Sequence, residues 1–456
     1  MLEASASLNG TPDVPSLVTL AWHLRQRDER RSTAMMEHVV GECLFDAPPA
    51  GVERGCWRRA LLVLAESRYL HGRLDEADQL ARAVDSSAGS EFDFIDMSDA
   101  RLLRALVVQD LGDRSGRSKL LYEAAHFAWL GGDALRADHA HALHAFLESY
   151  AGAAATEARW SATMSSMVSS PSAALRALAS EFKASLACDR SKYLDAIRHY
   201  RDAAELAKGV GMVRRSIVAR CCLGLCLSSL EKVDEALDEL ERALADARIS
   251  GWNRCIGTCL LELGHVLLQG GRRDEAAACI AEAETALDGI ATSLTALSLQ
   301  NYRGELELSR AHPAAALQSF IQESELAQLH NSPMHQALAL AGQARAFAAL
   351  GSPAAAMRAA ETALSLARLL DSARLECEAL VLRSSLLAEI GDQDPTALKR
   401  VIEDLERAIE AAARMAGFAG TSRLHAALEA ARRRFILAPD AHRVVQFAPA
   451  VADRKY

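Results

Sequence analysis

Three histidines within six residues could bind a metal ion. His139, His141 and His144 lie in the segment DHAHALHAF, and His126 lies one expected helix earlier. Imidazole nitrogens are common zinc ligands, and residues three apart can share a helix face. A motif this short is weak evidence for a metal, however, and ordinary histidines on a polar helix face are the favoured interpretation.

Two pairs of cysteines offer a second candidate metal site. Cys222 and Cys226 are four residues apart, as are Cys255 and Cys259, and the two pairs fall on neighbouring expected helices. Four thiolates could bind zinc. Along their own helices, however, the two pairs are offset from each other by about seven residues, which is roughly 10 Å. We therefore expect these cysteines to be buried as small apolar side chains, without a metal or another cofactor.

Common catalytic motifs are missing from the sequence. It has neither GxxxxGK[ST] nor GxGxxG, which bind phosphates, and it has no HExxH, GxSxG or EF-hand loop. An enzyme would need a nucleophile and a base that converge in the fold, and no motif supplies them. We predict that the protein is not an enzyme.

The composition favours a helical protein. Half of the 456 residues are hydrophobic and only 5% are aromatic, with Ala, Leu, Glu and Arg abundant. The net charge of −9 argues against a protein that holds phosphate backbones. The polar amino-terminal stretch does not resemble a signal peptide, and no apolar run is long enough for a membrane span. We expect a cytoplasmic protein that neither binds nucleic acid nor inserts into a membrane.

A repeat with a period of about 40 residues organises the chain. Small residues recur at steps of 39 or 40, and seven residues after each comes a position suited to a tight turn. The small residues are Ala65, Ala105, Ala145, Ala184, Gly224, Gly264, Gly304, Ala344 and Ser384. The turn positions are Gly72, Gly112, Gly152, Ser191, Glu231, Gly271, Ala311, Gly351 and Gly391. This spacing predicts two antiparallel helices per repeat, joined at the turn.

The second helix of each repeat has a pattern of its own. Five residues after the turn position comes Ala in most copies, and four residues later a larger side chain follows in several of them. These larger side chains are Tyr200, Leu240, Ile280 and Phe320. Helices that pack closely need a small side chain where they cross, so we expect the small residue of the first helix to face the second helix. A single pair cannot bury its apolar faces alone, and neighbouring pairs must stack.

This pattern resembles the tetratricopeptide repeat, most clearly in residues 172–208, 213–248, 252–287 and 333–369. The period exceeds the roughly 34 residues of that repeat, which implies longer helices and is similar to the regulatory arms of MalT-type transcription activators. HEAT and armadillo repeats, with periods of about 40–47 residues, are the architectural alternative. The resemblance implies an all-α fold, a right-handed α-solenoid of about nine to ten antiparallel helix pairs.

The repeats divide the chain into three segments. We predict a disordered amino terminus over 1–15, a repeat array with a terminal capping helix over 16–436, and a flexible tail over 437–456. The first pair is expected within 16–44, followed by a loop over 45–54. The tail segment VVQFAPAV is apolar enough to fold back into a groove of the array.

Some stretches fit the pattern poorly. The copies at 99–130 and 133–168 carry Arg117 and Glu157 at the expected Ala position, which predicts a distortion or a bend.

The stretch 89–100 is acidic and could receive a basic partner, but a solvated cap on the next helix is the favoured interpretation. Its acids are Glu91, Asp93, Asp96 and Asp99.

The resemblance also implies where a ligand would bind. In tetratricopeptide proteins, ligands usually contact first-helix residues on the concave face, and helical spacing carries these positions over to this chain. They are Arg59, Glu66, Tyr69, Gln109, His139, Glu181, Thr258, Glu262, His265, Gln269, Ser298, Asn301, Glu305 and Arg345. The stretch from Glu262 to Arg345 is the richest in polar groups. The Lys, Asn and Arg clamp for C-terminal carboxylates in some family members is not recognisable here.

Two functions compete. The first is a non-catalytic bacterial protein that binds a protein or peptide partner in the groove, in signalling or regulation. The second is a sensory arm that responds to a small molecule or peptide and acts on a separate output protein. The segments LAWHLRQRDERRS and LHAALEAARRRF resemble the sensory repeat regions of bacterial diguanylate cyclases, but no GGDEF-like motif follows. A homodimer is left open.

Overall fold

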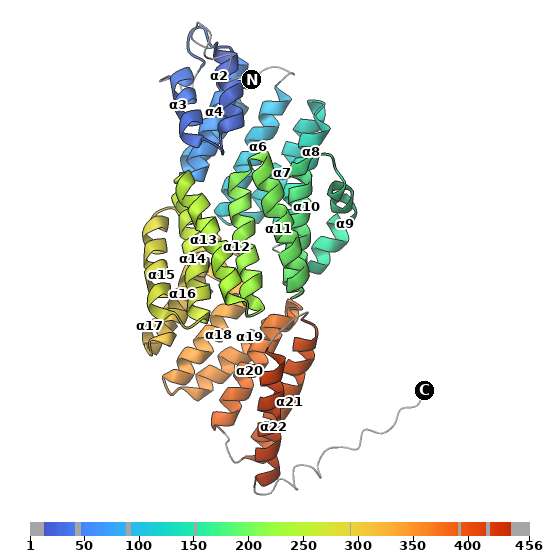
Figure 1. Ribbon diagram of the computed structural model, residues 1–456, viewed down its shortest axis with the longest axis vertical. Helices are drawn as coiled ribbons and strands as arrows, with labels where there is room; N and C mark the ends of the chain where they lie inside the picture. The colour runs from blue at the N-terminus through green and yellow to red at the C-terminus, as the bar shows by residue number, and fades with distance from the viewer. Residues whose placement is uncertain are drawn as a thin grey trace, which may run out of the picture. The chain divides into compact units, whose positions relative to one another are not determined.

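In the computed structural model, residues 13–41, 47–87, 93–149, 153–291, 293–390, 394–415 and 420–438 are described. Within these ranges all regular secondary structure is α-helical, in twenty-one helices (Figure 1). None of these helices combines the length and the apolar character that crossing a bilayer requires.

The helices follow one another as antiparallel pairs. The first five pairs are α2 (Val14–Leu24) with α3 (Glu29–Val40), α4 (Arg54–Leu70) with α5 (Leu74–Ser87), α6 (Phe94–Asp110) with α7 (Arg114–Leu130), α8 (Ala134–Ser149) with α9 (Ala153–Val168), and α10 (Ala173–Asp189) with α11 (Tyr193–Val210). The next five are α12 (Val213–Ser229) with α13 (Val233–Ser250), α14 (Asn253–Gln269) with α15 (Arg273–Leu287), α16 (Ser293–Ser309) with α17 (Pro313–Leu329), α18 (Pro333–Ala349) with α19 (Pro353–Leu369), and α20 (Ala373–Ile390) with α21 (Pro395–Ala413). A last helix, α22 (Thr421–Leu437), packs on α21. The predicted all-α solenoid of helix pairs is confirmed.

The turns within the pairs adopt the backbone that the repeat predicts. Gly271 has a φ of 78°, and the corresponding positions Glu231 and Ala311 have φ values of 59° and 60°. These angles lie in the left-handed region, which glycine adopts without the steric penalty that a Cβ brings. The repeat therefore imposes one turn geometry even where its sequence does not supply glycine. Gly152 and Gly391 lie outside the described residues.

The small residues of the first helices face the large residues of the second helices. A Cβ on Gly304 would lie 2.6 Å from Cε1 of Phe320, and a Cβ on Gly224 would lie 2.7 Å from Cγ of Leu240. Both distances are too short for a carbon–carbon contact, so the helices could not approach as closely with a larger residue. The predicted crossing point is confirmed at these repeats.

Both irregular copies still form helix pairs, but α8 and α9 pack on each other less extensively than α6 and α7 do, in keeping with the expected distortion of the second copy. Helices α6 and α7 have 17 residues each, and α8 and α9 have 16 each. Arg117 replaces the usual Ala on α7 and is buried, with Nη1 donating to Gln109 Oε1 at 2.6 Å and to the Leu147 carbonyl at 3.3 Å. Two acceptors on neighbouring first helices thus accommodate the large side chain.

Contacts divide the chain into two compact units. Unit 1 comprises residues 1–188, 195–228 and 232–299, and unit 2 comprises the remainder. Helix α2 begins at Val14, two residues before the expected start of the array. Most of the expected amino-terminal segment and nearly all of the expected tail, including VVQFAPAV, lie outside the described residues.

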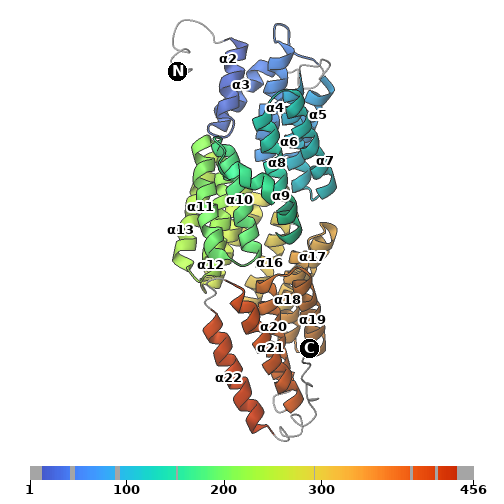
Figure 2. The ribbon, with the colours of Figure 1, turned by 90° about the vertical axis from the view of Figure 1, so that its right-hand side faces the viewer.

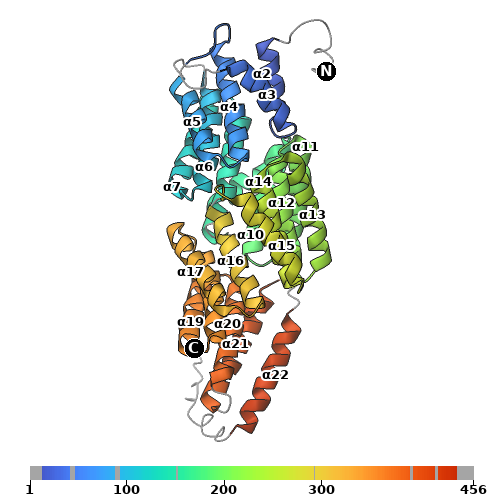
Figure 3. The ribbon, with the colours of Figure 1, turned by 90° about the vertical axis from the view of Figure 1, so that its left-hand side faces the viewer.

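In unit 1 the first pair contacts repeats far along the chain. The α2–α3 turn lies beside the α11–α12 turn, as Figures 2 and 3 show from two sides. Arg27 Nη2 lies 3.5 Å from the Gly209 carbonyl, and the backbone N–H of Arg214 donates to Gln26 Oε1 at 3.3 Å. Unit 1 is therefore held together by more than contacts between neighbouring repeats.

Candidate binding site

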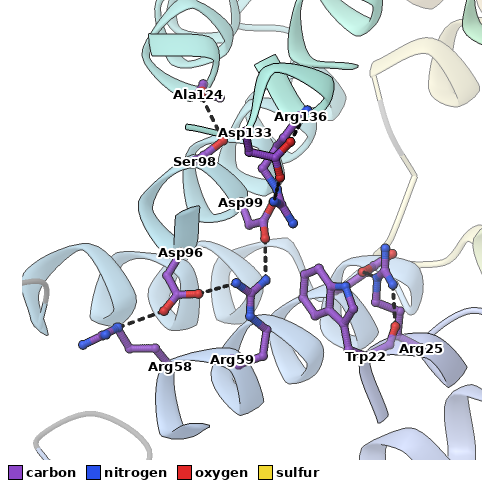
Figure 4. A network of polar contacts seen from close by, with 11 residues as sticks. Trp22, Arg25, Arg58, Arg59, Asp96, Ser98, Asp99, Ala124, Asp133 and Arg136 are labelled. Carbon is purple, nitrogen blue, oxygen red and sulfur yellow. Dashed lines mark hydrogen bonds and ion pairs between the residues drawn. The ribbon is translucent and has the colours of Figure 1, made fainter. Parts of the chain in front are cut away.

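A network of ion pairs joins the first helices α4, α6 and α8 (Figure 4). Arg59 donates to Asp96 and to Asp99, each at 2.5 Å, and Arg136 Nε donates to the other oxygen of Asp99 at 2.8 Å. Arg58 Nε donates to Asp96 Oδ2 at 3.1 Å. The prediction that Asp96 and Asp99 form a solvated cap is wrong, because arginines from the two neighbouring first helices neutralise both carboxylates. Glu91 lies outside the described residues.

The predicted residues Arg59 and Glu66 come together around Trp22. The guanidinium carbons of Arg25 and Arg59 lie 4.2 and 4.3 Å from the centre of the Trp22 ring. Glu66 accepts from Arg25 Nε at 2.8 Å and from Gln26 Nε2 at 2.5 Å. These contacts connect α2 to α4, so both predicted residues are already engaged within the chain.

Tyr69, another predicted residue, is buried between two arginines. The Arg254 guanidinium lies 4.5 Å from the ring centre and the Arg214 guanidinium 5.1 Å. Arg254 also pairs with Asp110 at 2.9 Å. Burial raises the pKa of Tyr69 to about 12, so the phenol is neutral and this group of four side chains carries one excess positive charge.

Arg214 is the source of that excess charge. Its side chain is half-buried, and in the part of the chain that the structure describes it forms no direct ion pair and no side-chain hydrogen bond. Burial opposes the charge, but the carboxylates of Asp110 and Glu181 nevertheless lie near enough to raise its pKa. By contrast, Arg59, Arg136 and Arg254 each pair with a carboxylate. A guanidinium has five N–H donors and no acceptor, so Arg214 is able to bind an anionic group.

His139 lies among paired arginines. Burial, together with the guanidinium groups of Arg215, Arg136 and Arg25, lowers its pKa to about 4, so the half-buried imidazole is neutral at pH 7. Glu181 is buried and pairs with Arg215. Burial raises the pKa of the Glu181 carboxyl even though Arg215 lies beside it. His139 thus offers one neutral donor and one acceptor beside a charged network.

The predicted residues on α14 form a short polar row. His265 Nε2 and Gln269 Nε2 are 2.8 Å apart, and Ser228 of α12 donates to Gln269 Oε1. Glu262 is half-buried on the same helix. Thr258 uses its hydroxyl to donate to the Arg254 carbonyl at 2.9 Å.

In unit 2 the predicted residues pair with one another or with the core. Arg345 and Glu305 form a two-pronged ion pair, with Nη1 2.7 Å from Oε2. Asn301 is buried and donates to Glu323 Oε2 at 2.8 Å, and the other oxygen of Glu323 lies 3.0 Å from His335 Nδ1. Asn301 therefore joins α16, α17 and α18 inside the unit. The stretch expected to be richest in ligand contacts is divided between the two units.

The remaining predicted residues, Gln109 and Ser298, form no hydrogen bonds with other predicted residues in the described part of the chain. Gln109 accepts from Arg117, and Ser298 is buried on α16.

Several cysteines pack as adjacent thiols that are buried or half-buried. Cys221 Sγ lies 3.5 Å from Cys259 Sγ, and Cys226 Sγ lies 4.0 Å from Cys188 Sγ. The hydrogen bond with Cys259 and burial raise the pKa of the Cys221 thiol. The described residues contain no group of three or more His, Cys, Asp or Glu side chains arranged to hold a metal ion.

Sequence reasoning missed Arg214, Arg254 and Asp110. The concave positions were counted from the crossing point, and both arginines lie ten residues before it, in the first turns of α12 and α14. The two arginines are 40 residues apart, which is one repeat length. This recurrence is the feature of the sequence that could have identified them.

The helix pairs and their turns define a tetratricopeptide-like repeat protein. No protein-family model and no curated protein matches the sequence. Among solved structures, a Rap protein complexed with competence and sporulation factor is similar at 11% identity and a TM-score of 0.48, over 83% of this chain and 98% of that one. The apo form of RapI is similar at 10% identity and a TM-score of 0.43, over 78% of this chain and 98% of that one.

A third similar structure is a signal transduction ATPase with numerous domains and a tetratricopeptide repeat sensor, from Pyrococcus horikoshii. Its identity is 11% and its TM-score 0.43, over 96% of this chain and 66% of that one. Likeness at this level does not carry an activity or a partner from one protein to another.

Proposed function

We propose that this chain is a non-catalytic bacterial cytoplasmic repeat protein that binds a protein or peptide partner through its first helices, in signalling or regulation. The guanidinium of Arg214 carries this proposal, because it has no direct ion pair in the described chain. Asp110 and Glu181 stabilise its charge only from beyond ion-pair distance, so its N–H donors remain without a carboxylate partner. An acidic side chain or the terminal carboxylate of a partner peptide would supply that partner.

The surroundings of Arg214 favour a peptide over a simple ion. Stacking on the Tyr69 ring holds the guanidinium in place, which lowers the entropy that binding would cost. Further first helices carry His139, His265 and Gln269, which can donate to or accept from a peptide backbone. Recognition of this kind needs no reacting group, in keeping with a non-catalytic role.

The test compares wild-type protein with Arg214→Gln. Because Arg214 has no direct ion pair in the described chain and loses mainly its stacking on Tyr69, this substitution should lower the stability by no more than about 1 kcal/mol. A partner recovered from host lysate should bind the variant about 10- to 100-fold more weakly, the range expected for losing a hydrogen-bonded charge. Arg198→Gln, on the exposed surface of α11, is the matched control and should bind like wild type.

Equal affinity of wild type and Arg214→Gln for the recovered partner would contradict the proposal. In that case the partner's cross-linked residues, identified by mass spectrometry, would show which other surface it uses.

A second candidate is a regulatory arm that acts on a separate output protein, similar to the sensory repeat regions of diguanylate cyclases. It is favoured by the end of α22, where Ile436 and Leu437 are 73% and 83% exposed. Adjacent exposed apolar side chains are typical of a surface that another protein covers. Replacing both with Asp should abolish binding to an output protein, or dissociate a homodimer in sedimentation experiments. A partner that is retained by this variant would exclude α22 as the contact.

A further inference from the structure

A pocket of about 370 Å³ lies in unit 1, between the α2–α3 turn and helices α11 to α14. Its lining includes Arg27 and Arg30 on one side and Lys208, Asp246, Ile249 and Trp252 on the other. The volume is at the lower end of the range for small-molecule sites, which suits a ligand between an amino acid and a dipeptide in size. Arg214, Tyr69 and His139 do not line it.

Two arginines of the α2–α3 turn reach two successive repeat turns. Gly211 precedes α12 and Gly251 precedes α14, 40 residues later. A Cβ on Gly211 would lie 2.1 Å from Arg27 Nε, so the arginine side chain packs directly over this glycine. A Cβ on Gly251 would lie 3.4 Å from Arg30 Nη2. The two guanidinium groups therefore lie near equivalent points of neighbouring repeats.

The carboxylates that line the pocket already have partners. Asp28 accepts from the backbone N–H of Arg31 at 3.3 Å, and Asp246 lies 3.4 Å from Lys208 Nζ. Glu29 bonds to Thr33 at 2.8 Å and to other side chains on α4 and the turn after it. None of these three acids pairs with Arg27 or Arg30.

The two arginines, by contrast, have donors to spare. Among the described residues, the Arg27 side chain hydrogen-bonds only to the Gly209 carbonyl, at 3.5 Å. Arg30 is exposed and has no hydrogen bond or ion pair within the described ranges. Each guanidinium has five N–H donors, and most of the ten donors of this pair can bind an anionic group. Three cations and three carboxylates line the pocket, so its formal charge is balanced, but the N–H donors of Arg27 and Arg30 are not taken up by these carboxylates.

An apolar surface adjoins these cations. Ile249 is 83% exposed, which is unusual for a large aliphatic side chain beside a pocket, and the buried Trp252 also belongs to the lining. Val213 adds a third apolar side chain. A ligand with an apolar group would cover Ile249 and gain the free energy of that burial.

We propose that this pocket binds a small carboxylic acid with an apolar side chain, such as an acylated amino acid. The carboxylate lies between Arg27 and Arg30, and the side chain lies against Ile249. A phosphate dianion fits less well, because Asp28, Glu29 and Asp246 line the same pocket and would repel the second charge. Since the lining comes from α2–α3 and from α11 to α14, a bound ligand bridges the contact that closes unit 1.

The experiment uses the full chain and defined probes. The N-acetyl derivatives of leucine, phenylalanine and tryptophan are titrated by calorimetry, in parallel with their carboxamides and with inorganic phosphate. At least one acid should bind with a dissociation constant of about 1 mM or lower. It should raise the melting temperature, whereas its carboxamide should bind at least about tenfold more weakly because it lacks the charge.

Variants then locate the site. Arg30→Gln should weaken binding of the acid by about tenfold or more, because an arginine–carboxylate pair is lost. Arg433→Gln, on the exposed face of α22, removes the same charge elsewhere and should bind like wild type. Arg214→Gln should also bind the acid like wild type, which separates this pocket from the peptide site proposed above.

Three outcomes would overturn the proposal. Equal binding of acid and carboxamide would show that the arginines do not recognise a carboxylate. Phosphate that binds more tightly than every acid would assign the pocket to a different ligand class. A lack of binding by all probes at about 10 mM would exclude this class of ligand.

Discussion

Arg254 on α14 donates a hydrogen bond of 2.8 Å to the backbone carbonyl of Tyr69 on α4, 185 residues earlier in the chain. Stacked repeat arrays usually join each repeat only to its neighbours. Here the second and seventh helix pairs meet through a guanidinium that is 4% exposed and that also pairs with Asp110. Unit 1 is therefore closed by a buried polar contact as well as by stacking.

Replacing Arg254 with Ala should destabilise unit 1 by about 3–5 kcal/mol, because it leaves the buried Asp110 carboxylate without its partner. Chemical denaturation gives the free energy of unfolding, and hydrogen exchange should show the loss in α4 and α14 together. Arg242→Ala, on the exposed face of α13, is the control and should change stability by less than about 1 kcal/mol. A similar small effect for Arg254→Ala would mean that the contact contributes little to closure.

Ala311→Gly should stabilise the protein by up to about 1 kcal/mol. Ala311 has a φ of 60°, where a Cβ is strained and glycine is not. The reverse change at the equivalent turn, Gly271→Ala, should destabilise by a similar amount, because its φ is 78°. Thermal unfolding of the two variants measures both effects. Melting temperatures that move in the same direction would contradict the assignment of strain.

His139 should make the stability of the protein depend on pH. Its pKa falls from an ordinary value of 6.5 to about 4 in the folded protein, so the unfolded chain binds the proton more readily. The contribution is complete above pH 6.5 and is lost as the pH falls toward 4, by at most about 3 kcal/mol. His139→Gln should show a smaller loss of unfolding free energy over this interval. Parallel pH profiles for the two proteins would show that His139 does not titrate as described.

Glu305 and Arg345 should be energetically coupled. Either single charge reversal, Glu305→Arg or Arg345→Glu, places two like charges together and should cost about 0.5–1 kcal/mol, since both side chains are partly exposed. The double reversal restores opposite charges and should recover most of the loss. A double-mutant cycle by chemical denaturation measures this coupling. Additive effects of the two single changes would show that the pair contributes no coupling energy.

The repeat geometry could be predicted from the sequence because it depends on local requirements. The contact of Gly304 with Phe320 and the left-handed turn at Ala311 follow from spacing alone, since helices that cross closely need a small residue and a short turn needs a positive φ. The charges of α6 could not be assigned in the same way. Asp96 and Asp99 have the spacing of a solvated cap, and only the fold shows that arginines of α4 and α8 face them.

The candidate site was less predictable for the same reason. The concave positions named Tyr69 and Asn301, but both are buried, Tyr69 beside Arg254 and Asn301 beside Glu323. Periodicity places a residue on a face of its helix. It does not reveal which distant segment covers that face, and the first pair of helices covers part of unit 1 from more than 180 residues away.

The bond between Arg254 and Tyr69 also sets an order of events during synthesis. A solenoid with neighbour contacts alone can fold repeat by repeat as each pair leaves the ribosome. The Tyr69 carbonyl, however, meets its donor only after 185 further residues have been added, which takes about 10–40 s at ordinary rates of translation. During that interval the Tyr69 carbonyl on α4 lacks the Arg254 donor that it bonds in the folded protein. Because the contact joins residues so far apart in sequence, its formation is a late and slow step in the folding of unit 1.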